Sequence, residues 1–192
     1  MKRFLSLAVA LSFLFVAAAV TPVIGVELVD AKKAPVGFVK VVEVKDPKTG
    51  KMTMEATFDT TAYHLSPVTI HQFLTAYGLD IVDAKKAALG TGWYVRESEV
   101  KDPKTGKVTR EHTFNSVASS WTASEFHQIL SAYGLRLVDA KKAALGTGWY
   151  VRESEVKDSK TGEIKTEYVF NDTAQTRTAG ELNQILSAYG RQ

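Results

Sequence analysis

The chain has 192 residues, with 24 lysine and arginine residues against 21 aspartate and glutamate residues, a net charge of +3 and 45% hydrophobic residues. Part of the positive charge and part of the hydrophobic content lie in the first 25 residues. Leaving out Lys2 and Arg3 reduces the count to 22 basic against 21 acidic residues. Nucleic acids and anionic membrane surfaces select a clustered excess of positive charge. The composition therefore argues against both kinds of partner.

Residues 1–25 are predicted to be a secretory signal peptide. Lys2 and Arg3 precede an apolar run over residues 4–20, and three alanines at 17–19 provide small residues for cleavage. We expect the cut between residues 19 and 25.

An uncleaved membrane anchor is the alternative, because residues 4–24 are long enough to span a bilayer. Thr21, Pro22 and Gly25 weaken that interpretation. No second apolar stretch of spanning length follows, so we expect a periplasmic or extracellular protein with no transmembrane segment after signal removal. The absence of cysteine means that packing, and not disulfides, must stabilise it.

Internal repetition is the strongest signal in the sequence. Val82–Asp102 recurs unchanged at Val138–Asp158, and a third, divergent copy begins with the same motif at Val29. The tripeptide Ala-Tyr-Gly closes each copy, so we predict three tandem repeats of roughly 55 residues, at 26–78, 79–134 and 135–190. Each copy contains as many acidic as basic residues, which also argues against a polyanionic partner.

Each copy is predicted to end in an amphipathic helix. Thr122 with Glu125 and Thr178 with Glu181 form the capping-box pattern, and Ser66 before a proline fits the same position in the first copy. Apolar residues follow at helical spacing, and a glycine stands at each expected C-terminal cap: Gly78, Gly134 and Gly190. One apolar stripe on each helix predicts one sheet face for the helix to cover.

A β-hairpin is predicted before each helix. In the third copy, two β-rich runs at 149–156 and 164–170 flank the turn sequence Asp-Ser-Lys-Thr-Gly, and the other copies have Asp-Pro-Lys-Thr-Gly. A short apolar stretch opens each copy and predicts one more strand. The fold class is therefore α+β, with three βββα units, each an antiparallel meander or hairpin plus one C-terminal helix. Residues 139–145 also fit a short helix capped by Asp139, an alternative that remains open.

Each hairpin is also expected to contact a helix through its last residue. Phe58, Phe114 and Phe170 close the second strand of the three hairpins. We expect these rings to face the helix.

Two pairs of aromatic residues are the candidate ligand-binding residues. Trp93 with Tyr94 and Trp149 with Tyr150 follow glycine-rich segments, which can present a flat surface for a sugar ring or a peptide. The structural alternative, which we favour, is that the Trp and Tyr of each pair start a strand with one side chain facing inward and the other outward.

The histidines give little support for a metal or an acid–base site. His71 and His127 share one helix position, where the third copy has Asn183, and no histidine pair shows the spacing of metal ligands on a helix. An envelope enzyme or enzyme inhibitor with a site between the repeats is the alternative function, and it requires His112, Glu125 and His127 to converge. We predict no catalytic residues, no metal and no cofactor.

The lysine pairs that recur in all three copies are interpreted as charged edges that prevent unwanted strand pairing. The preferred function is an exported, non-enzymatic repeat protein that serves as a structural or binding scaffold at the cell envelope or outside the cell. Its expected partners are further copies of itself or an envelope glycan or protein.

Overall fold

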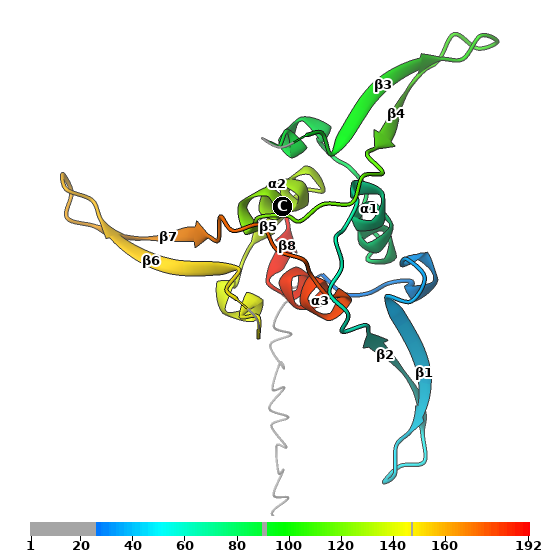
Figure 1. Cartoon of the computed structure of the whole chain (residues 1–192), viewed down its shortest axis with the longest axis horizontal. Helices are drawn as coiled ribbons and strands as arrows, with labels where there is room; N and C mark the ends of the chain where they lie inside the picture. The colour runs from blue at the N-terminus through cyan, green and yellow to red at the C-terminus, as the bar shows by residue number, and fades with distance from the viewer. Residues whose placement is uncertain (1–25, 90–91, 147) are drawn as a thin grey trace, which may run out of the picture.

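The structure, a computed structural model, describes residues 26–89, 92–146 and 148–192. These residues form a mixed α+β fold with antiparallel two-stranded sheets and three α-helices: α1 (Pro67–Ala76), α2 (Ala123–Ala132) and α3 (Ala179–Ser187). Figure 1 shows the helices grouped at the centre, with hairpins projecting outward from them. No helix among the described residues is long and apolar enough to cross a membrane.

The helix starts are the ones the sequence predicts. Thr122 and Thr178 form complete capping boxes with the glutamates three residues later, and the Ser66 side chain accepts the N–H of Thr69. These bonds satisfy backbone donors that the first turn of a helix leaves free. The C-terminal ends are predicted only in part. Gly78 and Gly134 have φ of +66° and +72°, whereas Gly190 lies in a short strand, β8 (Tyr189–Arg191).

The three predicted hairpins are present. They are β1 (Val39–Lys45) with β2 (Met52–Phe58), β3 (Val95–Lys101) with β4 (Val108–Phe114), and β6 (Val151–Lys157) with β7 (Ile164–Phe170). The turn sequence explains the reversal of the chain. In the second hairpin, Asp102 Oδ1 accepts the N–H groups of Lys104 and Thr105 at 2.7 and 2.9 Å, and Gly106 takes a φ of +70°.

The additional strand predicted at the start of each copy is present in the third copy only. Only Leu135–Leu137 forms a strand there, β5, and it pairs with β8 instead of with a hairpin. A 3-10 helix follows in each case, and an aspartate side chain accepts the N–H of its second residue: η1 (Ala31–Lys33), η2 (Ala84–Ala87) and η3 (Ala140–Ala143). The alternative of a short helix after Asp139 is therefore correct.

The three helices share one hydrophobic core, and the element that packs most closely on each helix is a 3-10 helix, which corrects the expectation of one sheet face for each helix. Buried residues of α1, α2 and α3 belong to a single hydrophobic cluster, and Leu74, Leu130 and Leu186 are completely buried in it. The strands, in contrast, are mostly exposed along their length. The core is thus a helical hub, and we call the three hairpins its arms.

The phenylalanine that ends each arm faces a helix, as predicted, but the helix belongs to another part of the chain. Phe114 of β4 stacks on His71 of α1, with 3.9 Å between ring centroids, and Phe170 of β7 stacks on His127 of α2 at 4.4 Å. A Cβ on Gly180 of α3 would lie 3.8 Å from the Cβ of Phe58 in β2. Each helix therefore contacts the arm of the next copy, and the last helix contacts the first arm.

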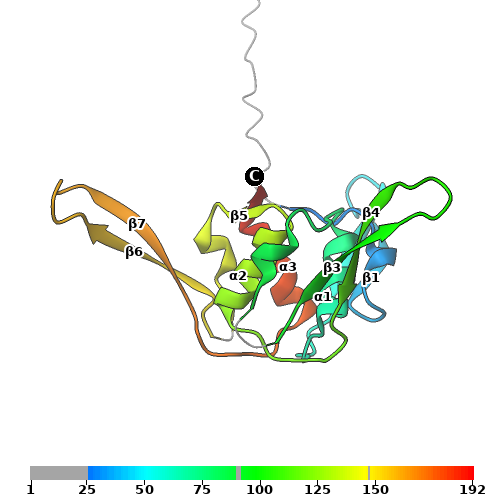
Figure 2. The ribbon, with the colours of Figure 1, turned by 90° about the horizontal axis from the view of Figure 1, so that it is seen from above.

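Backbone bridges close this arrangement into a ring. Leu65 pairs with Ser119, Trp121 pairs with Gln175, and Arg177 pairs back with Tyr63, each antiparallel and each joined by two hydrogen bonds of 2.9–3.3 Å. We call the contact of α1 with β4 the first junction, that of α2 with β7 the second junction, and that of α3 with β2 the closing junction. Figure 2 shows the arms extending away from the hub in the view from above.

Candidate functional site

The predicted aromatic pairs are divided between the core and the surface. Tyr94 and Tyr150 are 0% and 1% exposed, so neither contributes to an open stacking surface. Trp93 and Trp149 are half-buried, and the guanidinium carbons of Arg96 and Arg152 lie 4.2 and 4.4 Å from their ring centroids. This division agrees only in part with the structural alternative, because the strands begin at Val95 and Val151, after the two pairs. Gly90, Thr91 and Thr147 of the same motifs lie outside the described residues.

A groove lies beside Trp93 at the base of the second arm. Its volume is about 400 Å³, and its lining is mainly apolar, with Ala87, Leu89 and Val95 near the indole. Lys85 and Glu97 add one cationic and one anionic group. A smaller space of about 160 Å³ occupies the corresponding place on the third arm, between Lys141 and Glu153. The groove joins apolar surface to two charges of opposite sign.

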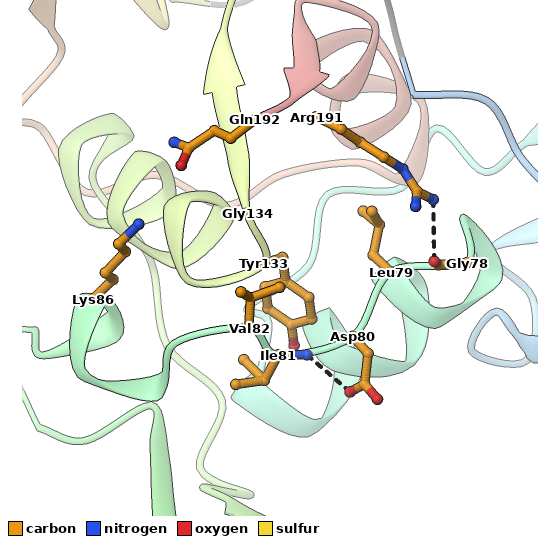
Figure 3. A pocket seen from close by; sticks show the side chains of 10 residues that line it. All are labelled: Gly78, Leu79, Asp80, Ile81, Val82, Lys86, Tyr133, Gly134, Arg191 and Gln192. Carbon is orange, nitrogen blue, oxygen red and sulfur yellow. Dashed lines mark hydrogen bonds between the residues drawn. The ribbon is translucent and has the colours of Figure 1, made fainter.

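A second pocket, shown in Figure 3, has a volume of about 420 Å³ and lies where the chain leaves α1 and where β8 ends. Lys86, Asp80, Arg191 and Gln192 provide its polar groups. Two of these are already used, because Arg191 donates to the carbonyl of Gly78 at 3.3 Å and the Asp80 carboxylate accepts the N–H of Ile81 at 2.8 Å. The sequence did not indicate this pocket. Residues 79–82, which line it, are predicted to form a strand but have an irregular conformation in the structure.

The residues of the alternative catalytic site have separate partners. His112 on β4 bonds to Glu97 at 3.2 Å, whereas His127 on α2 bonds to Tyr189 at 2.8 Å. Glu125 accepts the N–H of Thr122 in the capping box. Within the described ranges, no group of three or more histidine and carboxylate side chains is placed to hold a metal ion.

The shared helix position of His71, His127 and Asn183 lies at the three junctions. His71 Nδ1 is 2.8 Å from the hydroxyl of Tyr133, and His127 Nδ1 is 2.8 Å from that of Tyr189. The Tyr77 hydroxyl donates to Asn183 Oδ1 at 2.7 Å. The sequence showed that the three residues are equivalent, but it gave no sign of their tyrosine partners.

Burial is the main influence on these side chains. It lowers the pKa of His71 and of His127, because an imidazolium loses hydration in the interior. It raises the pKa of Tyr77, Tyr133 and Tyr189 for the corresponding reason, since a phenolate is the charged form. All five groups therefore favour their neutral forms at neutral pH.

The recurring lysine pairs are not on edge strands, which corrects the interpretation of their place. Each pair lies in the last turn of a 3-10 helix, at Lys32–Lys33, Lys85–Lys86 and Lys141–Lys142. Cations are favourable at that end of a helix because they face unpaired carbonyl groups.

The arms present exposed apolar side chains far from the hub. At the start of the second strand of each arm, Met52, Val108 and Ile164 are 53%, 52% and 67% exposed. Charged neighbours on the arms pair across the strands, as Glu97 does with Arg110 at 3.7 Å. Each arm is a separate two-stranded sheet, so neither of its edges continues into another sheet of the described chain.

No family model, curated protein or solved structure matches the chain. The arms, the grooves and the junctions are therefore the features from which a function is inferred. They indicate a hub with projecting hairpins.

Proposed function

We propose that the protein is an exported, non-enzymatic binding scaffold that acts at the cell envelope or outside the cell, with three repeats closed into a ring. The observation that supports it best is the contrast between a single buried hub and three exposed arms. Seven-residue strands extend from the hub, and their faces carry exposed apolar side chains such as Met54 and Ile164. Such surfaces are typical of sites that contact another molecule.

One arm alone offers a small contact. A strand of seven residues is about 23 Å long and a two-stranded sheet is about 10 Å wide, so one face covers about 230 Å². A stable interface uses about 800 Å² on each partner. Three arms on one hub raise the avidity for a repetitive partner without any new contact, because binding of the second arm becomes intramolecular. We therefore propose a repetitive partner, either an envelope polymer or an assembly of further copies.

The first test removes the apolar ends of the arms. We expect Met52→Lys, Val108→Lys and Ile164→Lys together to abolish binding to envelope material or self-association while the melting temperature stays the same. All three side chains are exposed, so the hub does not depend on them. The matched control is Val117→Lys, an exposed valine outside the arms. Unchanged binding by the triple variant would contradict the proposal.

Two further measurements separate the kinds of partner. Sedimentation over a concentration series rejects self-association if the protein remains monomeric at high concentration. Replacing Trp93 and Trp149 by alanine rejects ligand capture in the grooves if glycan or peptide binding is unchanged while the fold is intact. For export, we expect the recovered protein to begin between residues 20 and 26, which N-terminal sequencing decides.

A further inference from the structure

We propose that His71 and His127 make the first and second junctions acid-sensitive, so that mildly acidic surroundings loosen these two contacts while Asn183 keeps the closing junction shut. The inference concerns how the arms are held and does not depend on what they bind. It rests on the place of the two imidazoles in the ring. Each lies between a helix of one copy and the arm of the next copy.

A chain of hydroxyl groups ends at each imidazole. The Tyr94 hydroxyl is 3.0 Å from that of Tyr133, which is 2.8 Å from His71 Nδ1. The second junction repeats the chain, with the Tyr150 hydroxyl 2.8 Å from that of Tyr189 and Tyr189 bonded to His127. A neutral imidazole accepts at this nitrogen when its proton is on Nε2. The first chain then runs with Tyr94 donating to Tyr133 and Tyr133 donating to His71.

Protonation reverses that chain. An imidazolium carries a proton on both nitrogens, so His71 would donate to Tyr133, and the Tyr133 proton would lose its acceptor. That proton would then have to turn toward Tyr94 or remain without a partner. Within the described residues, the Tyr94 hydroxyl bonds only to Tyr133 and is completely buried, so its own proton would lose its acceptor. A buried donor without an acceptor is costly. The closed junction therefore disfavours the charged imidazole in addition to the effect of burial.

The groups that face the two imidazoles do not reverse this preference. Around His71, the negative charge of Asp80 favours protonation and a positive charge on His112 opposes it, and both effects are smaller than that of burial. Around His127, the facing side chains are the phenol of Tyr189 and the ring of Phe170, with Tyr150 one hydrogen bond further away. A phenylalanine face attracts a stacked cation, but the pKa of each histidine is still lowered.

At the closing junction, Asn183 takes the place of the two histidines, and its amide does not titrate near neutral pH. Asn183 accepts a hydrogen bond from Tyr77. Phe38 takes the sequence position of Tyr94 and Tyr150 in the other copies, and its ring contacts Phe73 of α1. An amide keeps the same hydrogen-bonding groups at every pH of interest. The chain therefore contains its own pH-insensitive version of the contact.

The size of the effect follows from proton linkage. An opened junction returns its histidine to an ordinary pKa of about 6.5, so opening is coupled to the uptake of one proton. The ratio of open to closed forms at each of these two junctions then rises up to about tenfold for each unit by which the pH falls below about 6.5, until the lowered pKa is reached.

Distances between the arm tips test the proposal directly. The chain has no cysteine, so pairs of spin labels can be placed at the exposed turn residues Lys48, Lys104 and Lys160. Each arm is joined to the helix of its own copy through the 3-10 helix between them, so loosening a junction separates two neighbouring copies. Between pH of about 7.5 and about 5, we therefore expect the 48/104 and 104/160 distances to broaden and the 48/160 distance to stay constant. Equal broadening of all three pairs, or of none, would overturn the proposal.

Matched substitutions identify the groups responsible. His71→Asn should cancel the response of the 48/104 pair alone, and His127→Asn that of the 104/160 pair alone. Asn183→His should create a response in the 48/160 pair, which gives a gain of function that does not depend on the stability of the other two variants. A response that persists in the double histidine variant would show that other groups are responsible.

The unlabelled protein provides an independent measurement. The imidazole proton signals of His71 and His127 in NMR spectra should titrate with midpoints below those of the same histidines in the unfolded chain. Midpoints equal to or above the unfolded values would contradict the proposal, whatever the labelled variants show.

Discussion

The Tyr77 hydroxyl donates to Asn183 Oδ1 at 2.7 Å and so joins the end of α1 to α3, 106 residues further along the chain. This bond belongs to the closing junction, where the last helix contacts the first arm. Tyr77 is completely buried and Asn183 is half-buried, so water does not fully replace either partner. The bond therefore contributes to the closure of the ring.

Tyr77→Phe tests that contribution. We expect the free energy of unfolding to fall by about 1–2 kcal/mol, because the Asn183 amide loses its donor in a half-buried place. Adding Asn183→Leu should restore part of the loss, since neither polar group then remains unpaired. Urea denaturation of the two single variants and the double variant measures the coupling. Additive losses would show that the two residues act independently.

Arg177 is a charged residue in a core position. It is 5% exposed, and its Nη2 is buried with no hydrogen-bond partner in the described part of the chain. The corresponding bridge residues of the other copies are Leu65 and Trp121. Arg177→Leu should raise the free energy of unfolding by about 1–3 kcal/mol, because an apolar side chain avoids the cost of burying the charge. The reverse change, Leu65→Arg, should lower it, and a destabilised Arg177→Leu would show that the guanidinium has a structural role.

Alkaline pH should destabilise the fold through its buried tyrosines. Burial raises the pKa of five of them: Tyr77, Tyr94, Tyr133, Tyr150 and Tyr189. An unfolded tyrosine ionises near pH 10, so above that pH the unfolded state releases protons that the folded state retains. The stability is thus fully present below about pH 10 and is lost as the pH rises above it. Ultraviolet titration should show most phenolate absorbance appearing together with the loss of helical circular dichroism, and not before it.

The arms should open more readily than the hub. A two-stranded hairpin is marginally stable in water, and the outer residues Val100 and Thr109 pair in strands that are exposed on both sides. We expect their amides to exchange with solvent much faster than that of Leu130 in α2, which is completely buried. Hydrogen-exchange mass spectrometry measures both. Equal protection of arm and hub would mean that the arms are held by a partner or by one another.

Local chemistry explains what the sequence predicts well. The capping boxes at Thr122 and Thr178 and the turn at Asp102 depend on residues two to four apart, so they are visible in the sequence. The burial of Tyr94 and the tyrosine partners of His71 and His127 depend on chain segments that are far apart in the sequence. Periodicity identifies a face that must be covered, but it does not identify the segment that covers it.

The strand predicted at Leu79–Val82 is an instructive error. Its apolar pattern is typical of a strand, but among the described residues no strand pairs with it. The corresponding residues Leu135–Leu137 do form a strand, because Tyr189–Arg191 lies beside them. Similar sequences thus differ in structure according to the neighbour that supplies their hydrogen bonds.

The placement of each arm against the preceding copy's helix also determines how the molecule carries mechanical load. A pull on the arm formed by β3 and β4 reaches α1 through Phe114 and His71 as well as α2 through the chain. Each arm therefore shares tension between two helices of the hub. The last arm is held in the same way by Phe170 and His127, and closure of the ring gives the first arm its second helix, α3.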